Sequence, residues 1–573
     1  MGPVLTTIAP MRTLRVSTQT WICYGVLLAL AIVVLAPIVL LIVNTFNTAG
    51  PGKPATYGLD TWREALSAPG LWTALVNTAK VVLTVQGLSF PIAILIAWLL
   101  ARTDLPRRRW LEFAYWIPFF LPTLGVTLGW ILVLDPQSGL LNMWIKKLGL
   151  ARESPFNIYS FWGIVFVHLG TFSISVKVMV LTPIFRNMDA SLEEVARVSG
   201  AGVPYTLRRV VIPLMTPALV VVFILGTVAG LNAFEVEQLL GLPARFFVFS
   251  TQMFGWVKAS PAQYGHATVL GVLVLCVMVP LILGQQWIAR KRVATVSGNI
   301  KTQPMPLRRW KWPAIAVVYT VLVFITVIPV IFMLAGSFMY LFGFFDIPQL
   351  WTLRHWTEVM TDSKFLTALQ NTIVVSTGTA IASVAIYSAI AYIIVRTEFV
   401  GRRAISVLSW MPFAIPGVIL GLGYLWFAFG VPFLMPLYGT VWLLVIVNVL
   451  TVMSLGTQIL QSTMANLSID LEEAGRVSGA AWLYIFRRIV IPLIAPTLAV
   501  VAIIAFVSAA RQVATVAILI VGDNHLLSTL QLNYLGGSEF EAASVVGMVI
   551  VLLSLIVALA VRVVFGRVGL PSA

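Results

Sequence analysis

Charged residues are scarce in this sequence. Only 10% of its 573 residues are Asp, Glu, Lys or Arg, whereas a typical soluble domain has about 25%. Hydrophobic residues make up 59%. A soluble chain of this length would divide into several domains, and each would need a polar surface. The shortage of charge therefore excludes an ordinary soluble protein and indicates a polytopic membrane protein.

The residues that build catalytic or metal sites are also few. Cys23 and Cys276 are the two cysteines, too few for a disulfide framework or a cysteine metal site, and we expect both to be packing residues. No G-x-x-x-x-G-K-[ST] phosphate loop occurs, because Asn47 stands where Gly52-Lys53 would need the first glycine. No nucleophile–base pair is evident, so we expect no enzyme activity, no bound cofactor and no assignable metal site. The four histidines are scattered and are expected to be packing or interface residues: His168, His266, His355 and His525.

Long apolar runs are abundant. A membrane-spanning helix needs about 20 apolar residues, and no alternating pattern of a barrel appears. The sequence therefore predicts an all-α membrane protein with twelve transmembrane helices. In the first half the apolar stretches are 22–46, 72–100, 112–134, 159–182, 211–233 and 266–288. In the second half they are 314–338, 367–395, 405–430, 438–461, 490–511 and 542–565.

The formal charge of +16 follows the predicted topology. If the N-terminus is cytoplasmic, most Lys and Arg residues fall on the inner side, which is the positive-inside pattern. We therefore expect both termini to be cytoplasmic, in a bacterial inner membrane, and no nucleic acid partner. The clearest clusters are Arg107–Arg109, Arg290–Arg292, Arg308–Lys311 and Arg402–Arg403.

The chain repeats itself. EEVARVSGAGVPYTLRRVVIPL at 193–214 and EEAGRVSGAAWLYIFRRIVIPL at 472–493 share 14 of 22 positions. WIPFFLPTLG at 116–125 likewise matches WMPFAIPGVI at 410–419. Because each half has six predicted spans, the copies are parallel repeats. We expect a first half at 1–288, a basic cytoplasmic linker at 289–313 and a second half at 314–573, with an extra external stretch at 135–158.

The repeated polar segments, at about 190–213 and 469–492, predict two short helices separated by a glycine. Ser191 with Glu194, and Asp470 with Glu473, match a capping signal. The central glycine permits a sharp bend, and Pro213 and Pro492 stand where the next membrane helix is expected to start. We interpret each segment as a rigid elbow for docking a partner. The alternative is an ordinary amphipathic loop helix that was duplicated.

These segments resemble the EAA signature of binding-protein-dependent ABC importer permeases. Val195 and Gly475 replace alanines of that signature. The resemblance covers nearly the whole chain. It implies that each elbow inserts into one of two cytoplasmic ATPase subunits, a homodimer that binds ATP and Mg²⁺. The coupling residues that it implies are Glu193, Glu194, Ala196, Gly200, Arg208, Arg209, Glu472, Glu473, Gly479, Arg487 and Arg488.

Several polar residues are candidates for the transport pathway. Glu235 and Glu237 are expected to face an external vestibule, near the position that Arg511 occupies in the other half. Asn77 and Asn371 are repeated near the outer ends of the second spans, either as pathway residues or as helix-packing hydrogen bonders. For Lys80, Lys177 and Arg511, snorkelling to the membrane surface is the simpler interpretation. The paired prolines Pro118, Pro122, Pro412 and Pro416 are expected to kink the third spans.

We interpret the chain as a fused permease whose halves form a pathway in the bilayer, with substrate delivered by an extracytoplasmic solute-binding protein. By resemblance, ferric iron is the favoured substrate, and thiamine, aminoethylphosphonate and polyamine are alternatives. A proton-coupled secondary transporter is the alternative of a different class, but it leaves the elbows unexplained. A membrane-embedded enzyme would need a catalytic cluster, and the sequence has none. The external loops expected to meet the binding protein are 47–71, 135–158, 235–265, 339–366 and 512–541.

Overall fold

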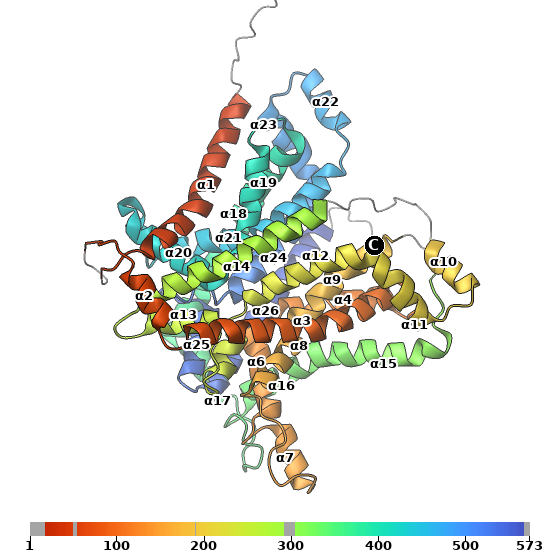
Figure 1. The fold of residues 1–573 in the computed structure, drawn as a ribbon, viewed down its shortest axis with the longest axis vertical. Helices are drawn as coiled ribbons and strands as arrows, with labels where there is room; N and C mark the ends of the chain where they lie inside the picture. Colours follow the sequence, from red (N-terminus) through yellow and green to blue (C-terminus); the bar gives the residue numbers. More distant parts are fainter. Residues whose placement is uncertain (1–17, 50–53, 189–190, 291–303, 567–573) are drawn as a thin grey trace, which may run out of the picture.

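The computed structural model describes residues 18–49, 54–188, 191–290 and 304–566. Within these ranges the regular structure is helical, with isolated β-bridges only. Figure 1 shows the helices gathered into one body, with α22 and α23 at the top, α10 and α11 at the right and α7 at the bottom. The predicted all-α class is confirmed.

Nine helices of the described residues are long and apolar enough to cross a membrane. Three further pairs of bent helices would raise the number to twelve if each pair counts as one span, so twelve stays a prediction. The helices that form the nine are α1 (Thr18–Asn44), α3 (Leu71–Arg102), α12 (Ile212–Leu231), α14 (Tyr264–Arg290), α15 (Lys311–Leu322) with α16 (Ile328–Phe338), α18 (Ser363–Arg396), α21 (Val441–Ala465), α24 (Ile491–Arg511) and α26 (Phe540–Gly566).

The third span of each half is broken rather than kinked. The chain turns by 96° between α5 and α6, and by 112° before α20. Pro122 and Pro416 stand directly before the second helix of each pair. Proline disfavours helical geometry in the residue before it, so the first helix of each pair ends there. The elements are α4 (Arg108–Ala114), α5 (Ile117–Phe120) and α6 (Thr123–Leu134), and α19 (Arg402–Trp410), η5 (Met411–Ala414) and α20 (Gly417–Gly430).

The fourth spans differ between the halves. The first half divides its span into α8 (Phe161–Gly170) and α9 (Phe172–Arg186), with Thr171 in extended geometry between them. The second half uses the continuous α21.

Pro213 and Pro492 lie in the first turn of α12 and α24, as the sequence predicts, but the membrane spans already begin before them. The fifth spans run through them, from Pro204 to Leu231 and from Trp482 to Arg511. A π-helical turn precedes each proline, η1 (Leu207–Val211) and η7 (Phe486–Val490). A wider turn can absorb the missing proline N–H without ending the helix. A similar turn, η4 (Val323–Val327), precedes Pro329.

The two halves interlock through their first spans. Helix α1 of the first half packs along α20 of the second, and α16 of the second half packs along α6 of the first. In both contacts, a glycine of one half packs against the backbone of a proline in the other half. A Cβ atom built on Gly129 would lie 2.3 Å from the Pro329 carbonyl oxygen, and one on Gly423 would lie 3.1 Å from the Pro37 carbonyl oxygen. Each half thus depends on the other for its packing.

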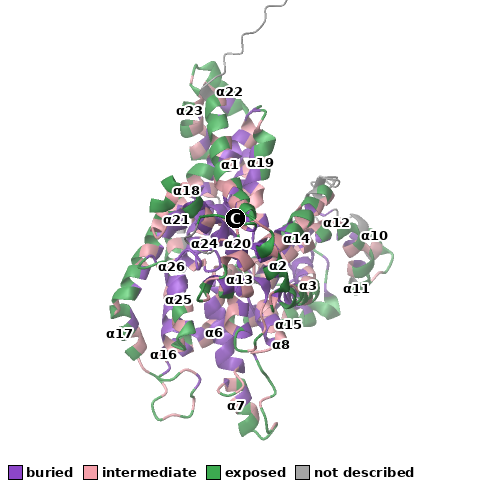
Figure 2. Ribbon diagram, turned by 60° about the vertical axis from the view of Figure 1, so that its left-hand side comes forward, coloured by how far each residue is buried: buried purple, intermediate pink, exposed green. Residues whose placement is uncertain are grey.

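Every loop expected on the outer side contains a short helix. Figure 2 shows buried residues concentrated in the middle of the molecule, while α7, α17 and α22 carry many exposed ones. Most of the expected linker lies outside the described residues. The loop helices are α2 (Asp60–Ser67), α7 (Leu140–Lys147), η2 (Glu237–Gly241) with α13 (Phe249–Lys258), α17 (Arg354–Thr361) and α25 (Leu527–Gly536); the remaining turns are η3 (Arg308–Trp310) and η6 (Pro432–Leu437).

The glycine contact between the halves generates a stability prediction. Gly129→Val should lower the melting temperature of the purified protein, because overpacking a close contact costs about 1–3 kcal/mol. The control is Gly87→Val on α3, where a Cβ atom meets nothing within 4 Å. Thermal unfolding followed by fluorescence measures both variants. Equal melting temperatures for the two variants would contradict the interlocked packing.

Candidate functional site

The two repeated polar segments fold alike. In the first, α10 (Ser191–Val198) and α11 (Val203–Thr206) flank Gly200, and in the second, α22 (Asp470–Val477) and α23 (Trp482–Ile485) flank Gly479. The glycines have φ values of +83° and +79°, and a Cβ atom on either would meet nothing within 4 Å. Their backbone conformation, rather than a close contact, therefore requires glycine. We call these segments the coupling segments.

A buried ion pair fastens each coupling segment to the end of a second span. Arg102 of α3 lies 2.6 Å from Glu193, and Arg396 of α18 lies 3.3 Å from Glu472. All four side chains are nearly inaccessible to solvent. The arginines belong to the repeated Arg-Thr-acid triplets at 102–104 and 396–398. Two motifs that are distant in the sequence are thus one structural unit in each half.

The same arginines also hold the turn before each coupling segment. Arg102 donates to the Met188 carbonyl oxygen at 3.3 Å, and Arg396 donates to the Met464 and Leu467 carbonyl oxygens at 2.7 Å each. Tyr392 adds a hydrogen bond of 2.9 Å to Glu472. Because the charged groups are bonded on several sides, the base of each segment is held rigidly.

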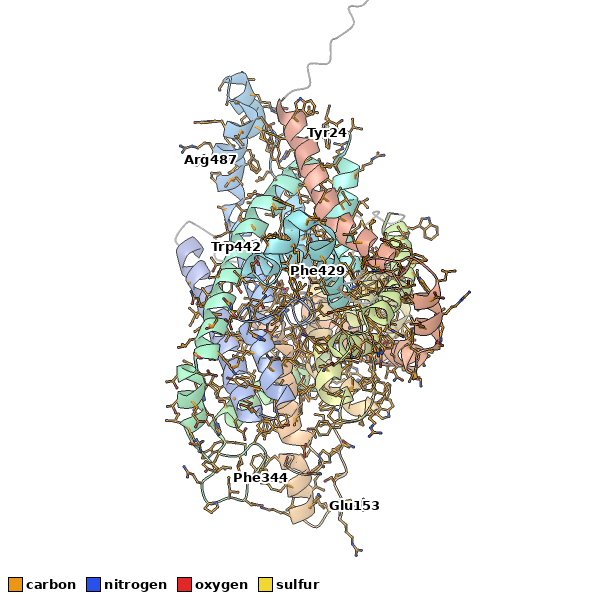
Figure 3. All side chains as sticks on the ribbon, turned by 90° about the vertical axis from the view of Figure 1, so that its left-hand side faces the viewer. Tyr24, Glu153, Phe344, Phe429, Trp442 and Arg487 are labelled. Atoms are coloured by element: carbon orange, nitrogen blue, oxygen red, sulfur yellow. The ribbon has the colours of Figure 1, made fainter. Side chains whose placement is uncertain are left out.

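The far side of each coupling segment presents apolar side chains to solvent. Val198 is 87% exposed and Val477 is 90% exposed, at equivalent positions of the repeat. Figure 3 shows Arg487 extending outward beneath the upper tip of the molecule. The side chains of Ser191 and Glu194 lie outside the described residues, and Ala196 is half-buried. The exposed polar members are Glu473, Arg208, Arg209, Arg487 and Arg488.

One part of the expected capping pattern is wrong. Helix α22 has Ile469 at its N-cap with no side-chain cap, and Asp470 lies in the first turn, where it accepts a hydrogen bond from Ser468. The buried ion pair of Glu472, rather than a cap, fixes this end of the segment.

The end of the linker is attached beside the first ion pair. Met305 donates to the Arg102 carbonyl oxygen at 2.8 Å, and Asp104 N–H donates back to Met305 at 3.1 Å. The Asp104 carboxylate accepts from Leu307 N–H at 2.9 Å. Glu398, the equivalent of Asp104 in the second half, is exposed. The described end of the linker is thus attached beside the ion pair of the first coupling segment.

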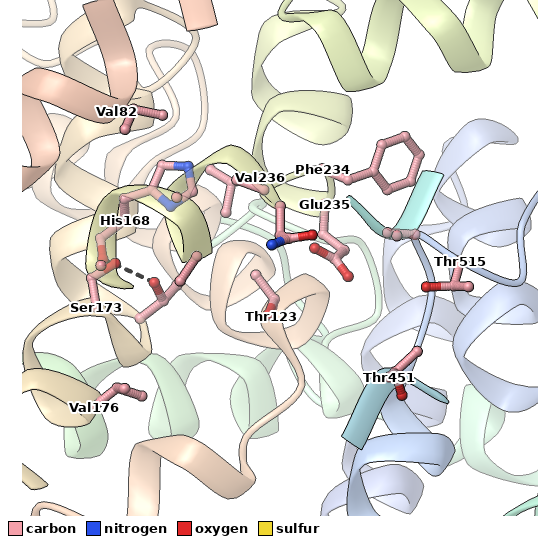
Figure 4. A pocket seen from close by; sticks show the side chains of 18 of the residues that line it. Val82, Thr123, His168, Ser173, Val176, Phe234, Glu235, Val236, Thr451 and Thr515 are labelled. Atoms are coloured by element: carbon pink, nitrogen blue, oxygen red, sulfur yellow. Dashed lines mark hydrogen bonds between the residues drawn. The ribbon is translucent and has the colours of Figure 1, made fainter. Parts of the chain in front are cut away.

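A cavity of about 360 Å³ lies between the two halves (Figure 4). The first half contributes residues of α3, α8, α9 and α12, and the second half contributes residues of η5, α20, α21 and α24. Its charged or titratable lining residues are His168, Lys177, Glu235 and Arg511. Its uncharged polar lining residues are Gln86, Thr123, Thr171, Ser173, Asn232, Thr451, Ser508, Gln512 and Thr515.

The two glutamates after α12 have different environments. Glu235 lines the cavity (Figure 4). Burial raises the pKa of its carboxyl above the ordinary value and Glu237 adds to this, whereas Arg511 and His168 act in the opposite direction. Glu237 is only 2% exposed and lies 2.7 Å from His168. The expectation that both glutamates face a vestibule is wrong for Glu237, which is paired inside the protein.

Arg511 connects the second half to the break in the first. It lies at the end of α24 and donates to the carbonyl oxygens of Phe119 and Leu121. Its guanidinium lies 4.8 Å from the centre of the Phe119 ring. The bend after α5 leaves carbonyl oxygens without helical partners, and inside a bilayer these need a donor. Arg511 therefore stabilises the broken span instead of reaching the membrane surface.

Lys177 also departs from the snorkelling interpretation. It is 5% exposed and lines the cavity. It precedes Arg186, the last residue of α9, by about 13 Å of helix at about 1.5 Å per residue. Its side chain is too short to reach that end. Lys80, in contrast, is exposed.

Asn77 and Asn371 hold the outer loops. Asn77 donates to the Phe247 carbonyl oxygen at 3.0 Å, and Asn371 donates to those of Asp523 and His525 at 2.7 and 3.1 Å. Neither residue lines the interface cavity.

Sequence reasoning missed the residues beside these asparagines. Thr78 and Thr372 accept from Phe249 N–H and Leu527 N–H, the first residues of α13 and α25. Ser250 and Ser528 bond the carbonyl oxygens of Ala233 and Gln512, both at 2.7 Å. The repeated Ser-Thr pairs at 250–251 and 528–529 could have indicated these contacts from the sequence.

Within the described part of the chain, no three His, Cys, Asp or Glu residues are placed to hold a metal ion. Cys23 is buried, as expected of a packing residue, whereas Cys276 is exposed, so the packing prediction is wrong for Cys276.

Comparison with known proteins agrees with this organisation. The family model "Binding-protein-dependent transport system inner membrane component" matches residues 382–569. A ferric transport system permease protein of Actinobacillus pleuropneumoniae is 25% identical over 80% of this chain, which corresponds to 66% of the relative. A probable ABC transporter permease protein of Sinorhizobium fredii is 27% identical over 75% of this chain and 76% of its own length. The crystal structure of a bacterial ABC transporter that imports alginate matches 48% of this chain and 97% of its own chain, at 18% identity and a TM-score of 0.41.

The family model lies in the second half, and matches over 75–80% of the chain extend across both halves. The duplicated coupling segments occur in both halves as well. These matches support a fused permease of a binding-protein-dependent ABC importer, with two permease halves in one polypeptide.

Proposed function

We propose that this chain forms the translocation pathway of an ABC importer and transmits the work of two cytoplasmic ATPase subunits to that pathway. The observation that carries the proposal is the pair of coupling segments. Each exposes apolar side chains at its tip and is fastened by a buried Arg–Glu pair to a long helix. A displacement of either tip is thereby passed to α3 or α18, and α3 lines the interface cavity.

The coupling segments belong on the cytoplasmic side in this proposal, together with both termini, in agreement with the positive-inside pattern. An extracytoplasmic solute-binding protein would then meet the opposite face, which carries α2, α13, α17 and α25. Helix α7 and the loop after α16 project on that face and are joined by an ion pair of 2.6 Å between Lys147 and Asp346. ATP and Mg²⁺ belong to the ATPase partner.

Ferric iron is the proposed substrate. Its support is the name of a similar permease from Actinobacillus pleuropneumoniae. The described residues form no ready-made site for a bare metal ion, so this chain would pass the substrate on rather than store it.

Reconstitution tests this function. The chain, its co-purifying ATPase and a loaded binding protein are placed in liposomes, and uptake of ⁵⁵Fe is followed with ATP inside or with a proton gradient alone. Uptake should require ATP. Uptake that proceeds on the gradient without ATP would assign the chain to the secondary transporters instead.

The exposed valines generate a docking prediction. Val198→Asp and Val477→Asp together should reduce co-purification of the ATPase by about tenfold or more, because each would bury an unpaired charge in the contact. Val400→Asp is the control, since Val400 is 91% exposed and lies outside both coupling segments. Pull-down with a tagged ATPase measures all variants. Equal losses for the test and control variants would contradict the docking role.

The first buried ion pair generates a prediction about stability and coupling. Arg102→Leu should destabilise the protein by about 3–5 kcal/mol, because it leaves Glu193 buried without its partner. Arg102→Leu with Glu193→Leu should recover most of the melting temperature, since an apolar pair of similar volume can replace a buried ion pair.

Binding-protein-stimulated ATPase activity provides the functional readout for these two variants. It should stay low in the double variant, because the carbonyl bond from Arg102 to Met188 is lost in both. A single variant as stable as the unaltered protein would show that the pair does not hold the segment.

A further inference from the structure

Lys177 carries an ammonium group deep inside the bundle. It is 5% exposed and lines the interface cavity, and it lies too far from the end of α9 to reach the membrane surface. A charge inside a membrane bundle is costly to insert. Such residues mark functional sites by default. A role for this charge is therefore required.

The protein itself does not neutralise Lys177. Among the described residues, no carboxylate lies within ion-pair distance of its Nζ atom. Its hydrogen bond in the described structure goes to the Ser173 carbonyl oxygen at 3.0 Å. An ammonium has three donors, so two remain for a ligand in the cavity.

The carboxylate of Glu235 faces other charged or titratable groups of the same cavity. Glu235 interacts electrostatically with Arg511 and His168, and Glu237 pairs with His168. The charges that line the cavity are thus two cations, Lys177 and Arg511, against the single carboxylate of Glu235. With Arg511 set against Glu235, Lys177 leaves one excess positive charge in the lining, which favours a negatively charged ligand over a bare metal cation.

A second buried polar group in the same cavity offers a hydrogen-bond acceptor to a ligand. Gln86 is 2% exposed, lines the same cavity, and its Oε1 atom has no hydrogen-bond partner within the described ranges. A Cβ atom on Gly226 would lie 2.8 Å from the Gln86 amide nitrogen, so the glycine makes room for this amide. A buried amide outside the protein's own hydrogen-bond network is expected where a ligand completes it.

The Lys177 site is not repeated in the second half. The residue equivalent to Lys177 in the second half is Gly456, at the offset of the coupling segments, and a Cβ atom there would clash with the Tyr387 ring. The cavity therefore has one ammonium site, on the wall contributed by the first half.

We propose that Lys177 binds an oxyanion group of the transported substrate, a carboxylate or phosphate that is either free or coordinated to ferric ion, while Gln86 Oε1 accepts a hydrogen bond from a hydroxyl or protonated oxygen of the same ligand. The assignment of this ligand as the substrate rests on the proposed function. Iron would then cross the interface as an anionic chelate, with Lys177 supplying the countercharge.

Equilibrium binding to the full chain in lipid nanodiscs tests the site without relying on transport. The probes are radiolabelled inorganic phosphate, citrate, and ⁵⁵Fe supplied as ferric citrate. Saturable binding of at least one probe is expected, with at least tenfold weaker binding by Lys177→Met and near-normal binding by Lys177→Arg. Lys80→Met is the matched control and should bind normally, since Lys80 is exposed and does not line the cavity.

The melting temperature separates a binding role from a structural one. Lys177→Met should be as stable as the unaltered protein or more stable, because it removes an unneutralised buried charge. Binding of ferric citrate alone would identify a chelate, and binding of free phosphate or citrate would identify a free oxyanion. Absence of saturable binding for all three probes, or unchanged affinity in Lys177→Met, would overturn the proposal. ATP-dependent uptake in liposomes reports separately on the proposed function.

Discussion

A lipid bilayer offers backbone groups no hydrogen-bond partners, and the arrangement of the two halves follows from this constraint. The third spans break at Pro122 and Pro416, and such breaks are tolerated only where the protein satisfies the exposed groups. At the first break, Arg511 of the opposite half bonds the carbonyl oxygens of Phe119 and Leu121. One side chain thereby stabilises irregular backbone, joins the halves and borders the cavity.

The coupling segments show how an exposed projection is made rigid. Their tips make few contacts with the rest of the protein, and the glycines at their bends have open space around them. Their rigidity comes from their bases, where Arg102 and Arg396 bind both a carboxylate and nearby carbonyl oxygens. Removing charges from water is costly, and several bonds to each charge offset that cost. The result is an apolar tip that is held firmly to the end of a long helix.

The two halves share their packing contacts but differ in the polar residues that line the cavity. Scaffold contacts are duplicated, including the glycine contacts of Gly129 and Gly423 and the hydrogen bonds of Thr78 and Thr372. The polar groups of the cavity are not, because Gly456 stands at the position equivalent to Lys177 and Ala514 at the position equivalent to Glu235. The two halves therefore share the packing that both need, while the lining of the cavity differs between them.

The sequence by itself determined the membrane class, the repeat and the two coupling segments, because apolar length and motif spacing are local properties. It could not reveal that Arg102 meets Glu193, since that pair depends on how α3 and α10 pack. It misplaced Lys177 and Glu237, because exposure to lipid, water or a cavity depends on neighbouring helices. It placed Pro213 and Pro492 at helix starts correctly but could not show that π-helical turns join those helices to the preceding segments. Tertiary structure alone decided which charges are buried, since burial is a property of the packed halves together.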